Sequence, residues 1–161
     1  MKSILLLIAL VSSSAFAAEH GLSLEHNRGV GYTFKADKFW AGINLGASQA
    51  QGAGLSDDSK QIVLSPRIFA NYDVCYAHSI PVFVGLSWAE EVGLGKSSNI
   101  SRTRVISVPM GMHVRVVPNL DIAGWANVFA NYSEELAGKS TWSDYRRGYL
   151  EFGGITGTYF F

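Results

Sequence analysis

The segment Arg104–Val117 reads RVISVPMGMHVRVV, and its spacing decides the fold. Apolar side chains occupy its even positions, namely Ile106, Val108, Met110, Met112, Val114 and Val116. The odd positions hold smaller or polar residues, among them Ser107, Gly111, His113 and Arg115. A period of two residues is typical of a β-strand with two different faces. The alternation runs through the whole segment, whereas strands of soluble proteins average about 5–6 residues.

The same alternation recurs on both sides of this segment, in Gln61–Val74, Ile80–Trp88 and Asp121–Tyr132. In each of them one face is apolar and the other holds small, polar or aromatic residues, with charged side chains in Gln61–Val74 and Asp121–Tyr132. The pattern predicts an all-β chain of eight strands, near residues 19–26, 30–36, 39–50, 61–74, 79–90, 104–117, 121–133 and 146–161. Three longer polar segments, 51–60, 91–103 and 134–145, separate some of these strands.

Short connections between the strands indicate antiparallel hairpins, because a hairpin must place like faces opposite each other. We expect a two-residue loop at Asp37–Lys38 and a three-residue loop at Pro118–Leu120. The registers that follow pair Phe34 with Ala41, Val116 with Ile122, and His113 with Trp125.

The first hairpin is expected to turn at Asn27–Gly29, with Gly29 in a left-handed conformation and Leu24 opposite Tyr32. One continuous strand through residues 20–35 is the alternative, but it would point Arg28 outward in mid-strand. The two strands of this hairpin are short. That leaves open a count of seven strands, or a barrel with one low wall.

The first eighteen residues predict an export signal. Lys2 precedes the apolar run Ile4–Val11, and Ala15-Phe16-Ala17 matches a cleavage site. The run is too short for a transmembrane helix, which needs roughly 20 apolar residues. We therefore expect residues 1–18 to be a Sec signal peptide and residues 19–161 to form one domain.

Composition excludes several classes of function. Lys+Arg 13 balances Asp+Glu 13, so no basic surface favours nucleic acid. Cys75 is the single cysteine, which rules out an internal disulfide. With His78 it supplies only two ligands, whereas zinc requires four. We expect no metal and no cofactor.

Two architectures suit these strands: a soluble sandwich or lipocalin-like barrel, and a transmembrane barrel. Only 16% of the residues are charged, against about 25% in soluble domains. The strand lengths match the roughly 9–11 residues of a tilted membrane strand. If the faces were reversed, Arg67 and Arg115 would lie in lipid at about 2–4 kcal/mol each. The sequence therefore predicts an all-β, eight-stranded antiparallel up-and-down transmembrane β-barrel, with Trp88, Tyr132 and Tyr149 near the membrane interfaces.

The C-terminal residues carry a family resemblance. Tyr159 and Phe161 alternate at the very end of the last strand, which resembles the terminal assembly signal of bacterial outer-membrane proteins. With the export signal and the strand count, the chain resembles the small eight-stranded outer-membrane barrels of the OmpA/OmpX type. The resemblance implies a bacterial outer-membrane location, contact with lipid and lipopolysaccharide, and folding by the barrel-assembly machinery. It also implies surface loops at 51–60, 91–103 and 134–145, periplasmic turns that include Cys75 and His78, and a monomer.

The inward face of such a barrel supplies candidate functional residues. We expect its charged side chains to form one lumen network: Glu25, Lys35, Arg67, Asp73, Arg115 and Asp121. Burial makes pairing of such charges obligatory. Trp40, Phe83, Trp125 and Phe129 would plug the remaining space, since a barrel of eight strands is only just wide enough for its own side chains.

The sequence therefore favours a non-enzymatic barrel with a structural or surface-interaction role, and we assign no catalytic residue. Trp142 and Tyr145, on a surface loop, are the candidate residues for contact with a surface ligand. One alternative is a lipid-A-modifying acyl hydrolase or transferase, with His26 near Ser48 or Ser133. A small pore is the third hypothesis.

Overall fold

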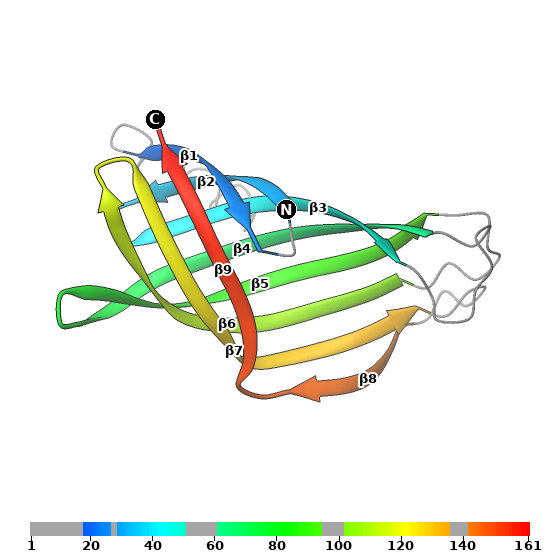
Figure 1. Ribbon diagram of the computed structural model, residues 1–161. Helices are drawn as coiled ribbons and strands as arrows, with labels where there is room; N and C mark the ends of the chain where they lie inside the picture. The colour runs from blue at the N-terminus through cyan, green and yellow to red at the C-terminus, as the bar shows by residue number, and fades with distance from the viewer. Residues whose placement is uncertain (1–17, 27–28, 51–60, 95–101, 136–141) are drawn as a thin grey trace, which may run out of the picture.

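The computed structural model describes residues 18–26, 29–50, 61–94, 102–135 and 142–161 (Figure 1). Every regular element in these ranges is a β-strand, and no helix in them is long and apolar enough to cross a membrane. The strands are β1 Glu19–Glu25, β2 Gly29–Ala36, β3 Phe39–Ala50, β4 Gln61–Ala77, β5 Ile80–Leu94, β6 Arg102–Val117, β7 Leu120–Glu135, β8 Trp142–Gly148 and β9 Glu151–Phe160.

The strands close into a barrel. From β1 to β7 each strand pairs antiparallel with the next. Both β8 and β9 lie along β7, and β9 also pairs with β1. The two segments are thus the two halves of one bent strand, and the ring has eight members. This confirms the predicted eight-stranded antiparallel barrel, and it shows that the first hairpin forms two strands of the wall.

The prediction of one unbroken last strand over residues 146–161 was wrong. The strand starts at Trp142, is interrupted at Tyr149–Leu150, and resumes at Glu151. Leu150 has φ 53, a left-handed conformation that cannot continue a strand. Before the bend, β8 pairs with residues 130–135 of β7. After the bend, β9 pairs with residues 120–127 of β7 and, on its other edge, with β1.

The short turns lie at one end of the barrel, which we call the turn end. The Asp37–Lys38 turn confirms the predicted register, with Phe34 opposite Ala41. His78 and Ser79 both have positive φ, 48 and 70, as in the type I′ turns whose twist suits a hairpin. The opposite end, where residues 51–60, 95–101 and 136–141 connect the strands, is the loop end.

Two predicted registers were wrong by two residues. Val114, not Val116, pairs with Ile122, and His113 pairs with Ala123, because the turn has two residues and a register shift follows Arg115. In the first hairpin Leu24 pairs with Val30. Gly29 has φ 77, as expected. An even error leaves every side chain on its predicted face.

A bulge in β7 reverses part of the predicted face assignment. Val108 pairs with Phe129 and Pro109 with Asn127, so Val128 has no partner on β6. Beyond it the inward and outward positions exchange. Phe129, expected in the lumen, instead contacts the exposed ring of Tyr149 with centroids 5.7 Å apart. Tyr132, expected in the membrane interface, shares the inner side with Glu151, to which it donates a hydrogen bond of 2.5 Å.

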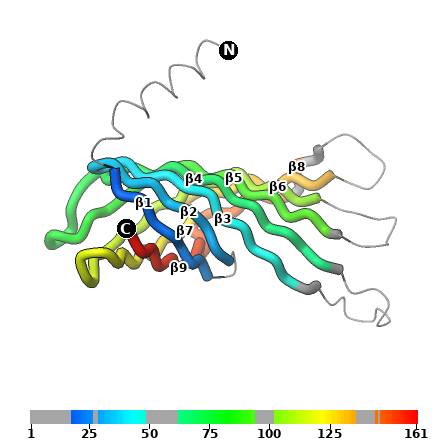
Figure 2. The backbone as a smooth tube through the Cα atoms, turned by 90° about the horizontal axis from the view of Figure 1, so that it is seen from above, coloured from blue at the N-terminus to red at the C-terminus, as the bar shows by residue number. Residues whose placement is uncertain are grey.

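The barrel wall is much lower on one side. β2 pairs with β3 only as far as Leu45, so the last part of β3 pairs with β4 alone. β8 likewise pairs only with β7. Figures 1 and 2 show β3–β7 extending past β1 and β2 at the loop end. The strands of this taller side also run further than predicted, because parts of the expected loops 91–103 and 134–145 belong to β5–β8.

Candidate functional site: the barrel interior

A layer of aromatic side chains crosses the inside of the barrel. Trp40, Phe69, Phe83 and Trp125 come from four different strands and are all at most 8% exposed. The Trp40 ring meets Phe69 and Phe83 edge-on, with centroids 5.7 and 4.8 Å apart. Such edge-to-face contacts add to the stabilisation from burial. The alternation in the sequence placed three of these residues inside, and Phe69 takes the place expected for Phe129.

On the loop-end side of this layer lies a buried ion pair. Both carboxylate oxygens of Glu25 on β1 accept hydrogen bonds, of 2.7 and 2.6 Å, from one guanidinium nitrogen of Arg67 on β4. The Asn44 amide also donates to Glu25, and Ser23 donates to Asn44 over 3.0 Å. The guanidinium lies 5.0 Å from the Phe69 ring centre and 4.8 Å from that of Trp125. The pair is thus joined to the aromatic layer.

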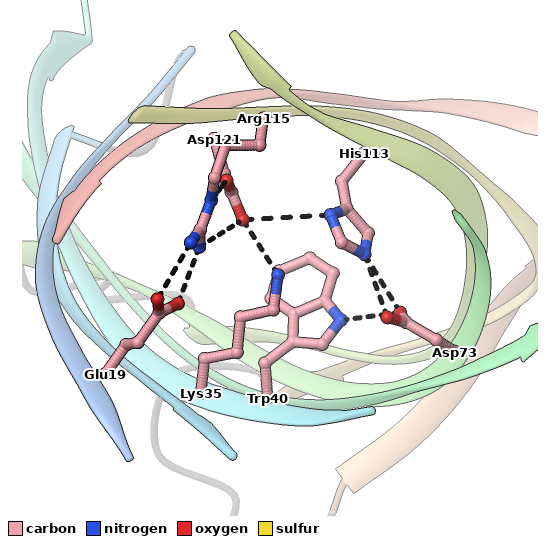
Figure 3. A network of polar contacts seen from close by, with 7 residues as sticks. All are labelled: Glu19, Lys35, Trp40, Asp73, His113, Arg115 and Asp121. Carbon is pink, nitrogen blue, oxygen red and sulfur yellow. Dashed lines mark hydrogen bonds and ion pairs between the residues drawn. The ribbon is translucent and has the colours of Figure 1, made fainter. Parts of the chain in front are cut away.

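On the turn-end side of the aromatic layer, Asp121 of β7 forms ion pairs with two basic side chains. Lys35 Nζ lies 2.9 Å from one carboxylate oxygen, and Arg115 Nε donates to the other over 2.7 Å (Figure 3). The remaining guanidinium nitrogens of Arg115 donate to Glu19 over 2.8 and 2.5 Å. Lys35 and Arg115 come from β2 and β6, so the cluster links strands that share no backbone ladder.

His113 connects this cluster to the aromatic layer. Its Nε2 lies 3.0 Å from the Asp73 carboxylate, and its Nδ1 lies 3.8 Å from Asp121 (Figure 3). The Trp40 indole N–H donates to Asp73 over 3.3 Å. The imidazole therefore stands between two carboxylates from opposite parts of the wall.

The structure places all six predicted network residues inside the barrel, but in two groups. Glu25 and Arg67 form one group, and the other four lie on the turn-end side of the aromatic layer. Our prediction omitted Glu19 and Asn44. Glu19 lies on the inward face of β1 together with Ser23 and Glu25, so the alternation of β1 could have predicted that Glu19 belongs to the network. The partner of each charge, in contrast, could not be read from spacing.

Two small cavities lie inside the part of the barrel that the structure describes. One cavity of about 10 Å³ lies beside Lys35, His113 and Asp121, and another of about 30 Å³ lies beside Arg67, Ser87 and Ser107. A water needs roughly 10–15 Å³, whereas small-molecule sites measure about 300–1,000 Å³. Each cavity suits one or two waters. In the part of the chain that the structure describes, no group of His, Cys, Asp and Glu side chains could hold a metal ion.

The structure does not bring His26 together with the serines considered for hydrolysis. His26 follows the inward Glu25 and so lies on the outer side of the wall, whereas Ser48 continues the inward positions of Asn44 on β3. Ser133 lies far along β7 and donates to Asp144 over 2.6 Å. The backbones of Trp142 and Tyr145 belong to β8, but the side chains of these two residues lie outside the part that is described.

Charged side chains also occur on the outer side of β5–β7 near the loop end, at the ends of the predicted strands and in the parts of β6 and β7 that we expected to be loops. Arg102 is paired with Glu90 and, over 3.3 Å, with Glu135. Arg104 lies two residues further along the same face of β6. No strand was predicted over Arg102, so its alternation was not used.

Comparisons with protein-family models, with curated proteins and with solved structures found no match.

Proposed function

We propose that this chain is a bacterial outer-membrane β-barrel with a closed lumen, which serves envelope structure or surface contact and has no catalytic residues. The observation that carries the proposal is the inverted distribution of side chains. Large apolar residues point outward while charged residues are buried inside. A water-soluble barrel would require the reverse.

Exposed apolar side chains occur all around the outside of the barrel. Leu22, Ile43, Ile68, Leu86 and Ile122 are each between 41% and 64% exposed. Soluble monomers rarely expose a contiguous apolar patch above a few hundred Å². In a bilayer the same side chains face lipid, and the closed ring leaves no unpaired strand edge along the low wall. Outer-membrane lipid and lipopolysaccharide are therefore the proposed surroundings.

The interior supports a sealed rather than a conducting barrel. The aromatic layer crosses the lumen, and ion pairs fill the space on both sides of it. A small pore would need a continuous aqueous path, and the cavities beside the layer hold only about 10 and 30 Å³. We infer that the lumen charges stabilise the barrel.

The taller wall gives the surface-contact role its physical basis. Beyond the low wall, β3 and β8 each have one edge without a strand partner among the residues described. Open edges do not occur in the hydrocarbon region, so this part of the wall would project into water. Trp142 and Tyr145 lie there as the proposed contact for a surface ligand. Tyr159 and Phe161, 56% and 72% exposed, remain the proposed signal for the assembly machinery. We expect a monomer.

Cys75 provides a direct test of the orientation. It is the only cysteine of the chain and is exposed near the turn end. A membrane-impermeant maleimide should leave it unlabelled in intact cells and label it once the outer membrane is permeabilised. A Cys75→Ser variant with Asp144→Cys moves the thiol to the loop end, where labelling should occur in intact cells. Labelling of Cys75 in intact cells, or equal labelling of both proteins, would contradict the proposal.

A further inference from the structure

The outer wall of the barrel carries an apolar groove of about 670 Å³ across β2–β6. Its deepest part follows from the register: Phe34 pairs with Ala41, Ala41 with Ala70, and Ala70 with Leu86. Two adjacent alanines between two large side chains leave a depression. The lining of the groove is almost entirely apolar, so it suits an apolar occupant.

The groove leads to charged side chains at one end. Trp88 and Ile106, which are paired across β5 and β6, line its loop-end side. Glu90 and Arg104, also a cross-strand pair, come next on the same outer face. Two residues along a strand span about 7 Å. A headgroup attached to a chain in the groove would therefore reach the Arg104 guanidinium.

The charged end favours a phosphate. Arg102 and Arg104 occupy successive outer positions of β6, and guanidinium groups bind phosphate through two parallel hydrogen bonds. Both arginines also face carboxylates: Arg102 contacts Glu90 and Glu135, and Arg104 lies opposite Glu90 and, across Ser133, on the row of Asp144. The site therefore presents both signs of charge. Elsewhere along the groove, the lining contains no charged side chain.

From these observations we propose that the groove binds one acyl chain of a phosphate-bearing lipid, whose headgroup is held by Arg104 with Arg102 beside it. The inference rests on the proposed membrane location and names a lipid partner for it. A second copy of the chain is the less suitable occupant. A two-fold dimer brings the same patch against itself, and two concave surfaces leave a void between them.

The test uses the refolded full chain in dodecyl maltoside, doped with dioleoyl phosphatidic acid or with dioleoyl glycerol. The two probes have the same acyl chains and differ only in the phosphate. Native mass spectrometry counts the lipid that each barrel retains. The wild type should retain one phosphatidic acid and about tenfold less of the glycerol lipid, since charge-assisted hydrogen bonds are the strong ones.

Two variants separate the acyl site from the headgroup site. Ala70→Leu fills the depression with an outward apolar side chain and should reduce retention of both lipids about tenfold. Arg104→Gln should lower phosphatidic acid to the level of the glycerol lipid. The matched controls are Ala126→Leu, on the outer side of β7, and Lys38→Gln, in the exposed turn between β2 and β3 at the turn end; neither residue lines the groove. Both should behave as the wild type does.

The experiment distinguishes failure of the lipid site from failure of the proposed membrane location. If Ala70→Leu retains as much phosphatidic acid as the wild type, or Arg104→Gln keeps the preference for it, the lipid site is wrong. Resistance of each variant to SDS before heating reports separately on the barrel. If the wild-type protein itself shows no such resistance and partitions into the soluble fraction, the membrane location fails instead.

Discussion

Glu25 and Arg67 meet inside the barrel with an N–O separation of 2.6 Å, although they are 42 positions apart in the chain. Both side chains are at most 6% exposed. The pair joins β1 of the low wall to β4 of the tall wall, so it connects strands that are not neighbours in the sheet.

We predict that Glu25→Gln destabilises the barrel, because the buried guanidinium of Arg67 loses its counter-charge. Breaking a buried pair costs about 3–5 kcal/mol, which a urea titration of the refolded protein would measure. Glu135→Gln is the matched control. It removes a partner of the half-exposed Arg102 and should cost about 0–1 kcal/mol. Equal midpoints for the two variants would show that the buried pair contributes no more than the exposed one.

A second prediction concerns two glycines of β9. A Cβ at Gly153 would collide with the Trp125 indole, whereas nothing lies within 4 Å of a Cβ at Gly157. Gly153→Ala should therefore cost about 1–3 kcal/mol through overpacking. Gly157→Ala should be neutral or slightly stabilising, since glycine weakens a strand. Thermal unfolding in detergent distinguishes them, and a Gly153→Ala barrel as stable as Gly157→Ala would place the indole elsewhere.

The proposal that the outer side faces lipid can be tested on a single strand. Ile68 is 52% exposed near the middle of β4, and Tyr76 is 60% exposed beside the turn. Arginine at the bilayer midplane costs about 2–4 kcal/mol and near an interface about 0–1 kcal/mol. We expect Ile68→Arg to lower the stability of the barrel refolded into phospholipid vesicles much more than Tyr76→Arg does. Similar losses would indicate that Ile68 does not face the hydrocarbon.

The proposed closed lumen predicts the absence of steady conductance. Protein reconstituted into planar bilayers should give no stable current steps if the aromatic layer and the ion pairs seal the interior as proposed. The control is a parallel sample whose SDS resistance shows that it is folded. Reproducible single-channel steps from such a sample would favour the pore hypothesis.

Much of the fold could be predicted from strand alternation. The period of two in β4 and β6 placed Arg67, Asp73 and Arg115 on the inner side, and the structure has them there. The errors in two hairpin registers were even, so they left the faces intact. Alternation reports which side a residue faces, and this information survives such a slip.

The partners of the lumen charges could not be predicted in the same way. Asp73 and His113 lie on strands that are not adjacent, and their contact depends on how the ring of strands is staggered. The bulge at Val128 had one signal that we did not use. Pro109, which cannot donate to a ladder, lies at the register shift, and proline within a sheet is confined largely to edges and bulges.

The migration of the unboiled protein in SDS gels tests the central claim most directly. Protein extracted from isolated outer membranes should migrate differently before and after boiling, because a closed barrel satisfies its own backbone hydrogen bonds and resists SDS until heated. The same sample should be absent from the soluble periplasmic fraction. A chain that migrates identically in both states and is recovered as a soluble protein would contradict the membrane barrel.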